Sequence, residues 1–321
     1  MKIKKFYMAA LAAAVLAGCS NDDELAGTQQ NVLPEDGVIR LEAGINGMNT
    51  RAVGYSESGL TELGLFVDNS SNATYTYNNV YMKKDDSDTW TSHKSDGTTS
   101  WMMLWQSESA TVDVTAYAPY DATATSGGTI TGTVEADQTT EENGQKSDVL
   151  YAKSSVTPNA PDASKDIYYD ATTQKLNVKM NHKLSKLTVN IRYGTEMTQG
   201  GATPSLTSVT LGETQTGYSL SLSDGSVKAS GDKSGITMML SDATATGYNK
   251  SAEAILVPQT AAFTITVTVD GRTFVYNNAD FLFSSGNAYT LNLLVGKDIV
   301  NIGDITASTW VTNEGGSLET E

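Results

Sequence analysis

The sequence has one cysteine, Cys19, and only two histidines and six prolines in 321 residues. A single cysteine excludes an intrachain disulfide, so stability must come from side-chain burial and from the hydrogen bonds of regular structure. No cysteine or histidine spacing typical of a zinc site occurs. After residue 24 no apolar run approaches the roughly 18 residues of a membrane span, and we find no convincing amphipathic helix.

Basic side chains are also scarce, with 21 lysines and arginines against 37 aspartates and glutamates and a net charge of −16. Such a surface repels phosphate backbones, which excludes nucleic acid as an expected partner. Hydrophobic residues make up 39% of the chain and include 15 tyrosines and 4 tryptophans, enough for packed cores. The length favours two domains.

The first 18 residues have the pattern of a secretory signal, in which three lysines precede an apolar run at residues 6–17. Residues 16–19 (LAGC) resemble a bacterial lipobox. We therefore expect Cys19 to carry acyl chains such as palmitate and to become the first residue of a membrane-anchored lipoprotein. The alternative is an ordinary secretory signal with a chance cysteine. Residues 19–37 are polar and lack periodicity, as in a tether.

Residues 38–45 alternate between apolar and polar side chains, which predicts a half-buried strand. Asn46 and Gly47 form a turn signal and end it. The apolar face of this strand carries Ile39, Leu41, Ala43 and Ile45.

The remainder is predicted to be all-β, and the spacing of its strands is typical of β-sandwiches. The clearest hairpin joins residues 263–269 to 272–276 through Asp270 and Gly271, which suit a type I′ turn. We expect two tandem sandwich domains at residues 38–172 and 173–321, with a boundary near 170–174. Further strands are expected at residues 62–67, 75–82, 110–118, 148–152, 175–180, 184–193, 205–212, 218–222, 236–240, 252–257 and 288–295.

Catalytic and metal chemistry is poorly supported, and we expect no cofactor and no metal. His93 is placed in a polar loop and His182 at a strand start, where a structural role is expected. The acidic residues 85–88 offer oxygen ligands for calcium but lack the glycine and the distal glutamate of an EF-hand loop. The tryptophans at 90, 101 and 105 suit either a packed interior or an aromatic platform for glycans.

Six segments occur in a characteristic order along the chain: residues 16–19 with the acidic residues 22–24, 49–52 (NTRA), 114–120 (VTAYAPY), 181–189 (NHKLSKLTV), 254–259 (AILVPQ) and 285–291 (SGNAYTL). In this order they resemble the fimbrillin family, the pilins and pilin-like surface lipoproteins of Bacteroidales. The resemblance runs from the signal to about residue 295 and implies two tandem transthyretin-like (Greek-key) β-sandwich domains.

The resemblance also implies a maturation step. An arginine-specific protease would cut between Arg51 and Ala52, removing the lipid and the strand within residues 38–51. A strand donated by another subunit would fill the vacated groove. The expected donor is the tail at 298–321, and the alternative is that this tail closes the sheet of its own domain. The donor face would carry Ile305, Ala307, Thr309 and Val311.

These expectations describe a non-enzymatic subunit of a cell-surface pilus or fimbria that serves adhesion. Its expected partners are other pilin subunits in a head-to-tail polymer, the outer membrane through lipidated Cys19 before processing, the protease, and a host or bacterial surface receptor. The alternative function is an outer-membrane surface lipoprotein that binds glycans and does not polymerise.

Overall fold

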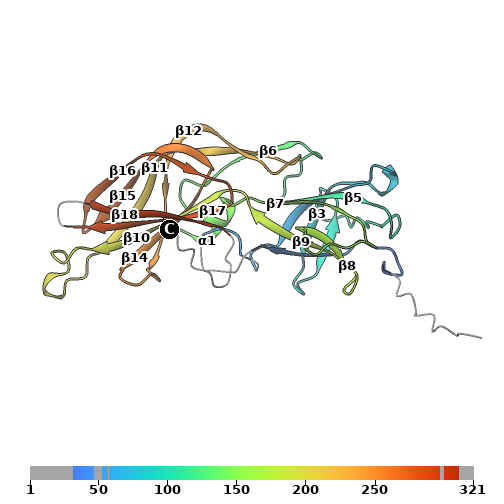
Figure 1. Cartoon of the computed structure of the whole chain (residues 1–321), viewed down its shortest axis with the longest axis horizontal. Helices are drawn as coiled ribbons and strands as arrows, with labels where there is room; N and C mark the ends of the chain where they lie inside the picture. Colours follow the sequence, from blue (N-terminus) through green and yellow to red (C-terminus); the bar gives the residue numbers. More distant parts are fainter. Residues whose placement is uncertain (1–31, 47–52, 57, 297–299, 311–321) are drawn as a thin grey trace, which may run out of the picture. The chain divides into compact units, whose positions relative to one another are not determined.

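A computed structural model describes residues 32–46, 53–56, 58–296 and 300–310 (Figure 1). Within these residues the chain is nearly all β, which confirms the predicted fold class. Cys19, Arg51, Ala52 and Val311 lie outside the described residues. The described residues all belong to one compact unit.

An eight-stranded sheet contains most strands of the first half. Its order is β1-β9-β7-β5-β2-β3-β4, with β8 also paired to β9. β1 runs parallel to β9, and the other neighbouring pairs are antiparallel. The strands are β1 (Leu41–Ile45), β2 (Glu62–Asp68), β3 (Tyr77–Lys84), β4 (Trp90–His93), β5 (Val112–Ala118), β7 (Leu150–Val156), β8 (Ile167–Asp170) and β9 (Lys175–His182).

Two five-stranded sheets follow. One has the order β13-β14-β10-β17-β18, and the other the order β12-β11-β15-β16 with β6 paired to β11. β10 and β17 are parallel and the remaining pairs antiparallel. Their strands are β6 (Thr129–Thr133), β10 (Ser185–Tyr193), β11 (Leu206–Ser221), β12 (Val227–Thr237), β13 (Met239–Asp242), β14 (Lys250–Leu256), β15 (Gln259–Val269), β16 (Arg272–Phe283), β17 (Asn287–Val295) and β18 (Val300–Thr309).

The predicted hairpin is confirmed as β15–β16, whose last pair is Val269 with Arg272. Both turn residues, Asp270 and Gly271, have positive φ, as a type I′ turn requires. Short elements absent from the sequence prediction are the helix α1 (Glu141–Lys146) and the 3-10 turns η1 (Ala73–Tyr75) and η2 (Gln199–Gly201).

Buried apolar side chains form two clusters. One contains buried residues from Ile39 to Met180, and the other is built mainly from residues 184–295. β9 pairs with β1, β7 and β8, although the sequence places it after the expected domain boundary. Met180 is the last buried residue of the first cluster, and the buried apolar residues from Leu184 onward belong to the second. The domain boundary expected at residues 172–173 stays a prediction.

Candidate functional site

β1 lies at one end of the eight-stranded sheet and covers the outer edge of β9. The pairing runs from Leu41 opposite Leu176 to Ile45 opposite Met180. Two further backbone bonds extend this ladder: the Leu176 amide donates to the Arg40 carbonyl at 2.7 Å, and the Asn46 amide donates to the Met180 carbonyl at 2.8 Å.

The residues just before β1 bond to a second backbone segment, which follows β4. Val38 forms a bridge with Leu104. The Ile39 amide donates to the Met103 carbonyl and the Trp105 amide donates to the Gly37 carbonyl, both at 2.9 Å. The chain from residue 37 to 46 therefore lies between β9 and residues 103–105 and is hydrogen-bonded to both.

Side chains on one face of this segment close the first core. Ile39 and Leu41 are 4% and 3% exposed, and Ala43 and Ile45 are half-buried against the same cluster. The intervening Arg40 and Glu42 are exposed, as the alternation predicts. The cluster that the apolar side chains of this segment join also includes Met103, Trp105, Leu176, Val178 and Met180.

Polar side chains add further contacts on and around the outer face of this segment. Arg40 pairs with Asp36 at 2.5 Å, and this hydrogen bond lowers the pKa of Asp36 to about 2. Glu42 pairs with Lys175 of β9 at 2.6 Å. The Asn46 side-chain amide donates to Asp166 at 3.1 Å and to Asn181 at 2.9 Å, so the end of β1 is tied to the strand beside it.

The expected donor segment forms β18, an edge strand paired antiparallel with β17 from Asn287 opposite Thr309 to Val295 opposite Val300. Ile305 is half-buried against the second cluster, whereas Ala307 and Thr309 are exposed. In this structure residues 300–309 of the tail thus lie in their own chain's sheet, the alternative that the sequence left open.

The other residues singled out in the sequence have structural settings. Trp90 and Trp105 are 7% and 6% exposed, and Trp101 is half-buried against the same cluster, which fits core packing. His93 ends β4 and contacts the Thr91 hydroxyl at 2.9 Å through Nε2, so its expected loop position is wrong. His182 is the last residue of β9, so its expected position at a strand start is wrong, and it lies 2.7 Å from the buried carboxylate of Asp148.

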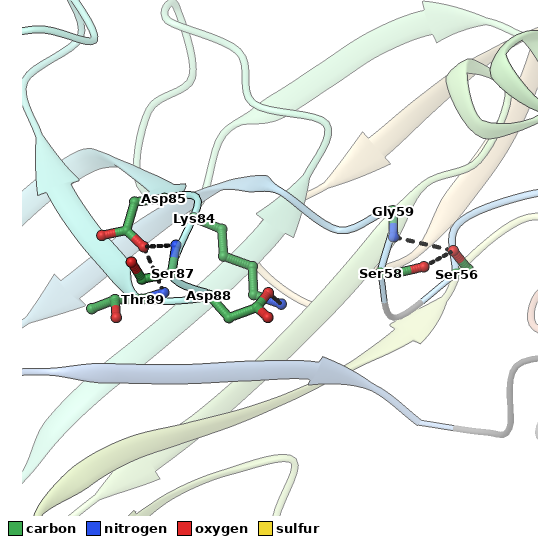
Figure 2. A network of polar contacts seen from close by, with 8 residues as sticks. All are labelled: Ser56, Ser58, Gly59, Lys84, Asp85, Ser87, Asp88 and Thr89. Atoms are coloured by element: carbon green, nitrogen blue, oxygen red, sulfur yellow. Dashed lines mark hydrogen bonds and ion pairs between the residues drawn. The ribbon is translucent and has the colours of Figure 1, made fainter.

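The acidic residues 85–88 make the turn between β3 and β4 (Figure 2). The Asp85 carboxylate accepts hydrogen bonds from the amides of Ser87 at 2.8 Å and Thr89 at 2.9 Å, and Asp88 pairs with Lys84 at 2.9 Å. Figure 2 also shows a second turn, in which the Gly59 amide donates to the Ser56 hydroxyl. The carboxylates of Asp85 and Asp88 are thus engaged within the turn.

No group of three or more metal-ligating side chains occurs among the described residues. None of the helices in the described ranges is long and apolar enough to cross a membrane. Trp310, which the sequence analysis did not single out, stacks on His182 with ring centroids 4.0 Å apart and planes 6° apart. An isolated aromatic residue near the end of the chain gives no sequence signal for this contact.

Comparison with known families decides the identity of this fold. Residues 50–310 match the family model described as fimbrillin-like. The chain belongs to the fimbrillin-like family. This membership indicates a fimbrial or adhesive role at the cell surface for a structural, non-enzymatic protein. No curated protein matches the sequence.

Solved structures of low identity share the fold of this fimbrillin-like chain. A candidate cell adhesion protein of Bacteroides ovatus is 19% identical with a TM-score of 0.64, and one of Bacteroides uniformis is 20% identical with a TM-score of 0.57. Each match covers 86% of this chain and 99% of the other.

Proposed function

We propose that this chain is a structural subunit of a cell-surface fimbria that polymerises by exchange of a β-strand and serves adhesion. It is made as a lipoprotein precursor attached to the outer membrane through Cys19. An arginine-specific protease cuts it between Arg51 and Ala52, and the fragment that leaves carries β1. Its partners are further copies or related pilin subunits and a surface receptor.

The position of β1 carries this proposal. Removing residues 38–51 uncovers one edge of β9 and the backbone of residues 103–105 together, because the segment is hydrogen-bonded to both. Unpaired backbone groups at a sheet edge favour pairing with another chain. The same removal leaves an apolar trough where Ile39 and Leu41 were buried.

Filling the trough contributes enough free energy to drive assembly. Burying one large aliphatic side chain contributes about 1.5–3 kcal/mol, so Ile39 and Leu41 together contribute roughly 3–6 kcal/mol. Each recovered backbone hydrogen bond adds about 0.5–1.5 kcal/mol. A donated strand with apolar residues at alternate positions recovers both terms, which is β-strand addition.

The donor is β18 with the residues after it. Within the described residues β18 pairs with no strand other than β17 and lies at the end of its sheet, so only one ladder of strand hydrogen bonds has to open to release it. Because the donor and the vacated groove are different surfaces, the contact is head-to-tail and builds an open filament.

The N-terminus and size of the surface protein test the proposal. We expect the protein recovered from cells to begin at Ala52 and to run as a ladder of multimers on unheated SDS gels. Arg51→Ala should keep Cys19 and its lipid and remain monomeric. Deleting residues 303–321 should abolish the ladder while the fold is kept. Wild-type protein that keeps Cys19 and still forms the ladder would contradict the role of cleavage.

A further inference from the structure

Three chain segments meet at the buried side chain of Asp148, which lies between α1 and β7 and has no exposed surface. Its Oδ1 accepts a hydrogen bond from the Val149 amide at 2.8 Å. Its Oδ2 accepts one from the Tyr55 amide at 2.9 Å and lies 2.7 Å from Nδ1 of His182.

Trp310 completes this cluster from the end of β18. Its ring lies flat on the His182 imidazole, whose side chain is 8% exposed. The Trp310 amide donates to the Gly286 carbonyl at 2.7 Å, one step beyond the last β17–β18 pair. The stack therefore joins the end of β18 to the end of β9, which lies in a different sheet.

The segment just after Arg51 lies against the same cluster. Gly54 has a φ of 111°, and a Cβ there would lie 3.0 Å from Asp148 Oδ2 and 3.3 Å from Trp310 Cζ2. Val53, two residues after Arg51, is 2% exposed, and its amide donates to Glu253 at 3.3 Å. Residues 53–55 thus contact the Asp148 carboxylate and lie beside Trp310 at once.

We propose that Asp148, His182 and Trp310 form a latch that holds the end of β18 on β17 in the uncut chain and is loosened by cleavage at Arg51. The inference rests on the proposed function, since it assigns a control to the donor strand. Trp310 and His182 are positioning residues in this account.

The physical reason is the change that cleavage makes to residues 53–55. In the uncut chain residues 53–55 are bonded to Asp148 through the Tyr55 amide, and the chain before them continues to Asn46, whose side chain is bonded to Asp166 and Asn181. After cleavage it becomes a chain end, and chain ends fray. Losing the Tyr55 bond and the packing at Gly54 uncovers Trp310, so that the strand bearing it separates more readily from β17. Processing then creates the groove and frees the donor together.

Hydrogen exchange of the β18 amides tests the latch in the full-length lipidated chain in detergent, uncut and after treatment with an arginine-specific protease. We expect exchange in β18 of the cut chain, measured in the monomer before multimers form, to be about 2- to 12-fold faster than in the uncut chain, the range for loss of one aromatic stack. Trp310→Ala should give that faster exchange without the cut. Trp310→Phe should preserve most of the protection.

Two further variants guard against a general loss of structure. Trp101→Ala removes a half-buried tryptophan that packs on Tyr77, and it should leave β18 exchange unchanged. Gly54→Ala should speed β18 exchange in the uncut chain, because its Cβ displaces residues 53–55. In all variants the β5–β7 ladder should stay protected.

The outcomes separate the latch from the proposed function. If uncut Trp310→Ala and cut wild-type protein both exchange in β18 at the uncut wild-type rate, the latch is overturned, whether or not the protein polymerises. If β18 exchange rises after the cut and yet no multimers form, the latch stands and the assembly proposal fails.

Discussion

Leu41→Ala should weaken the precursor and leave the assembled fimbria unchanged. Leu41 is 3% exposed and belongs to the first core cluster, so its truncation leaves a cavity among Met103, Leu176 and their neighbours. Such a change costs about 2–5 kcal/mol. Because the cut at Arg51 removes residue 41, the same substitution is absent from the mature subunit.

Urea unfolding of the uncut chain measures the first effect, and the temperature at which SDS-resistant multimers dissociate measures the second. Val114→Ala is the matched control, since Val114 is fully buried in β5 within the same cluster and stays in the mature chain. It should cost about 2 kcal/mol or more in the precursor and should also lower the dissociation temperature. A Leu41→Ala precursor as stable as wild type would refute the burial argument, and weakened multimers would refute removal of β1.

Three other predictions concern the groove left by β1, the Asp36–Arg40 pair and the turn between β3 and β4. A synthetic peptide of residues 36–46 should block multimer formation by the cut chain. Its Leu41→Lys version should be at least about tenfold weaker as an inhibitor, because burying an unpaired ammonium is costly. Equal inhibition by both peptides would argue against a shaped trough. The Asp36 carboxyl should titrate near pH 2 in the precursor, measured by NMR, and move toward 3.8 in Arg40→Ala. Since the pKa of Asp36 is lower in the folded state, the contribution of the Asp36–Arg40 pair to stability is present above about pH 4 and lost as pH falls toward 2. An unchanged pKa of Asp36 in Arg40→Ala would contradict the pairing. Millimolar calcium should not shift the melting temperature of the wild-type chain, because the Asp85 carboxylate is engaged by Ser87 and Thr89; a shift that Asp85→Ala abolishes would show a calcium site.

Sequence patterns predicted the clearly alternating strands well and the polar ones poorly. The long, mostly exposed β12 was missed apart from its last two residues, and the strands expected at 205–212 and 218–222 are a single strand, β11. β15 and β16 alternate cleanly and share an Asp270-Gly271 turn, so local information was sufficient. β4, β6 and β8 have four or five residues each and were missed, because pairing with neighbours, and not their own pattern, makes them strands. The short helix α1 was missed because Asn143 and Gly144 resemble a loop. Gly144 is required there, since a Cβ would lie 2.2 Å from Val53.

The candidate site was also predicted in part, where a local sequence pattern was sufficient. The buried face of residues 39–45 follows from alternation, but the partner strand does not: β1 pairs in parallel with residues 176–180, a contact between positions far apart in the sequence. The placement of Trp310 on His182 likewise joins two distant segments that no local pattern connects.

After loss of β1 the subunit must expose a groove and still stay folded. The way in which buried residues are divided between the two clusters meets this condition. Among the described residues, the second cluster contains no buried residue before Val53, so removal of residues 38–46 takes none of its buried members. The first cluster loses Ile39 and Leu41 from among its buried members and keeps those of β2, β3, β5, β7 and β9. The cut chain therefore retains most of its packing while exposing one apolar trough beside two unpaired backbone segments. Because all three exposed features lie along the path of a single missing strand, one incoming strand satisfies them together, and assembly is favoured over general collapse.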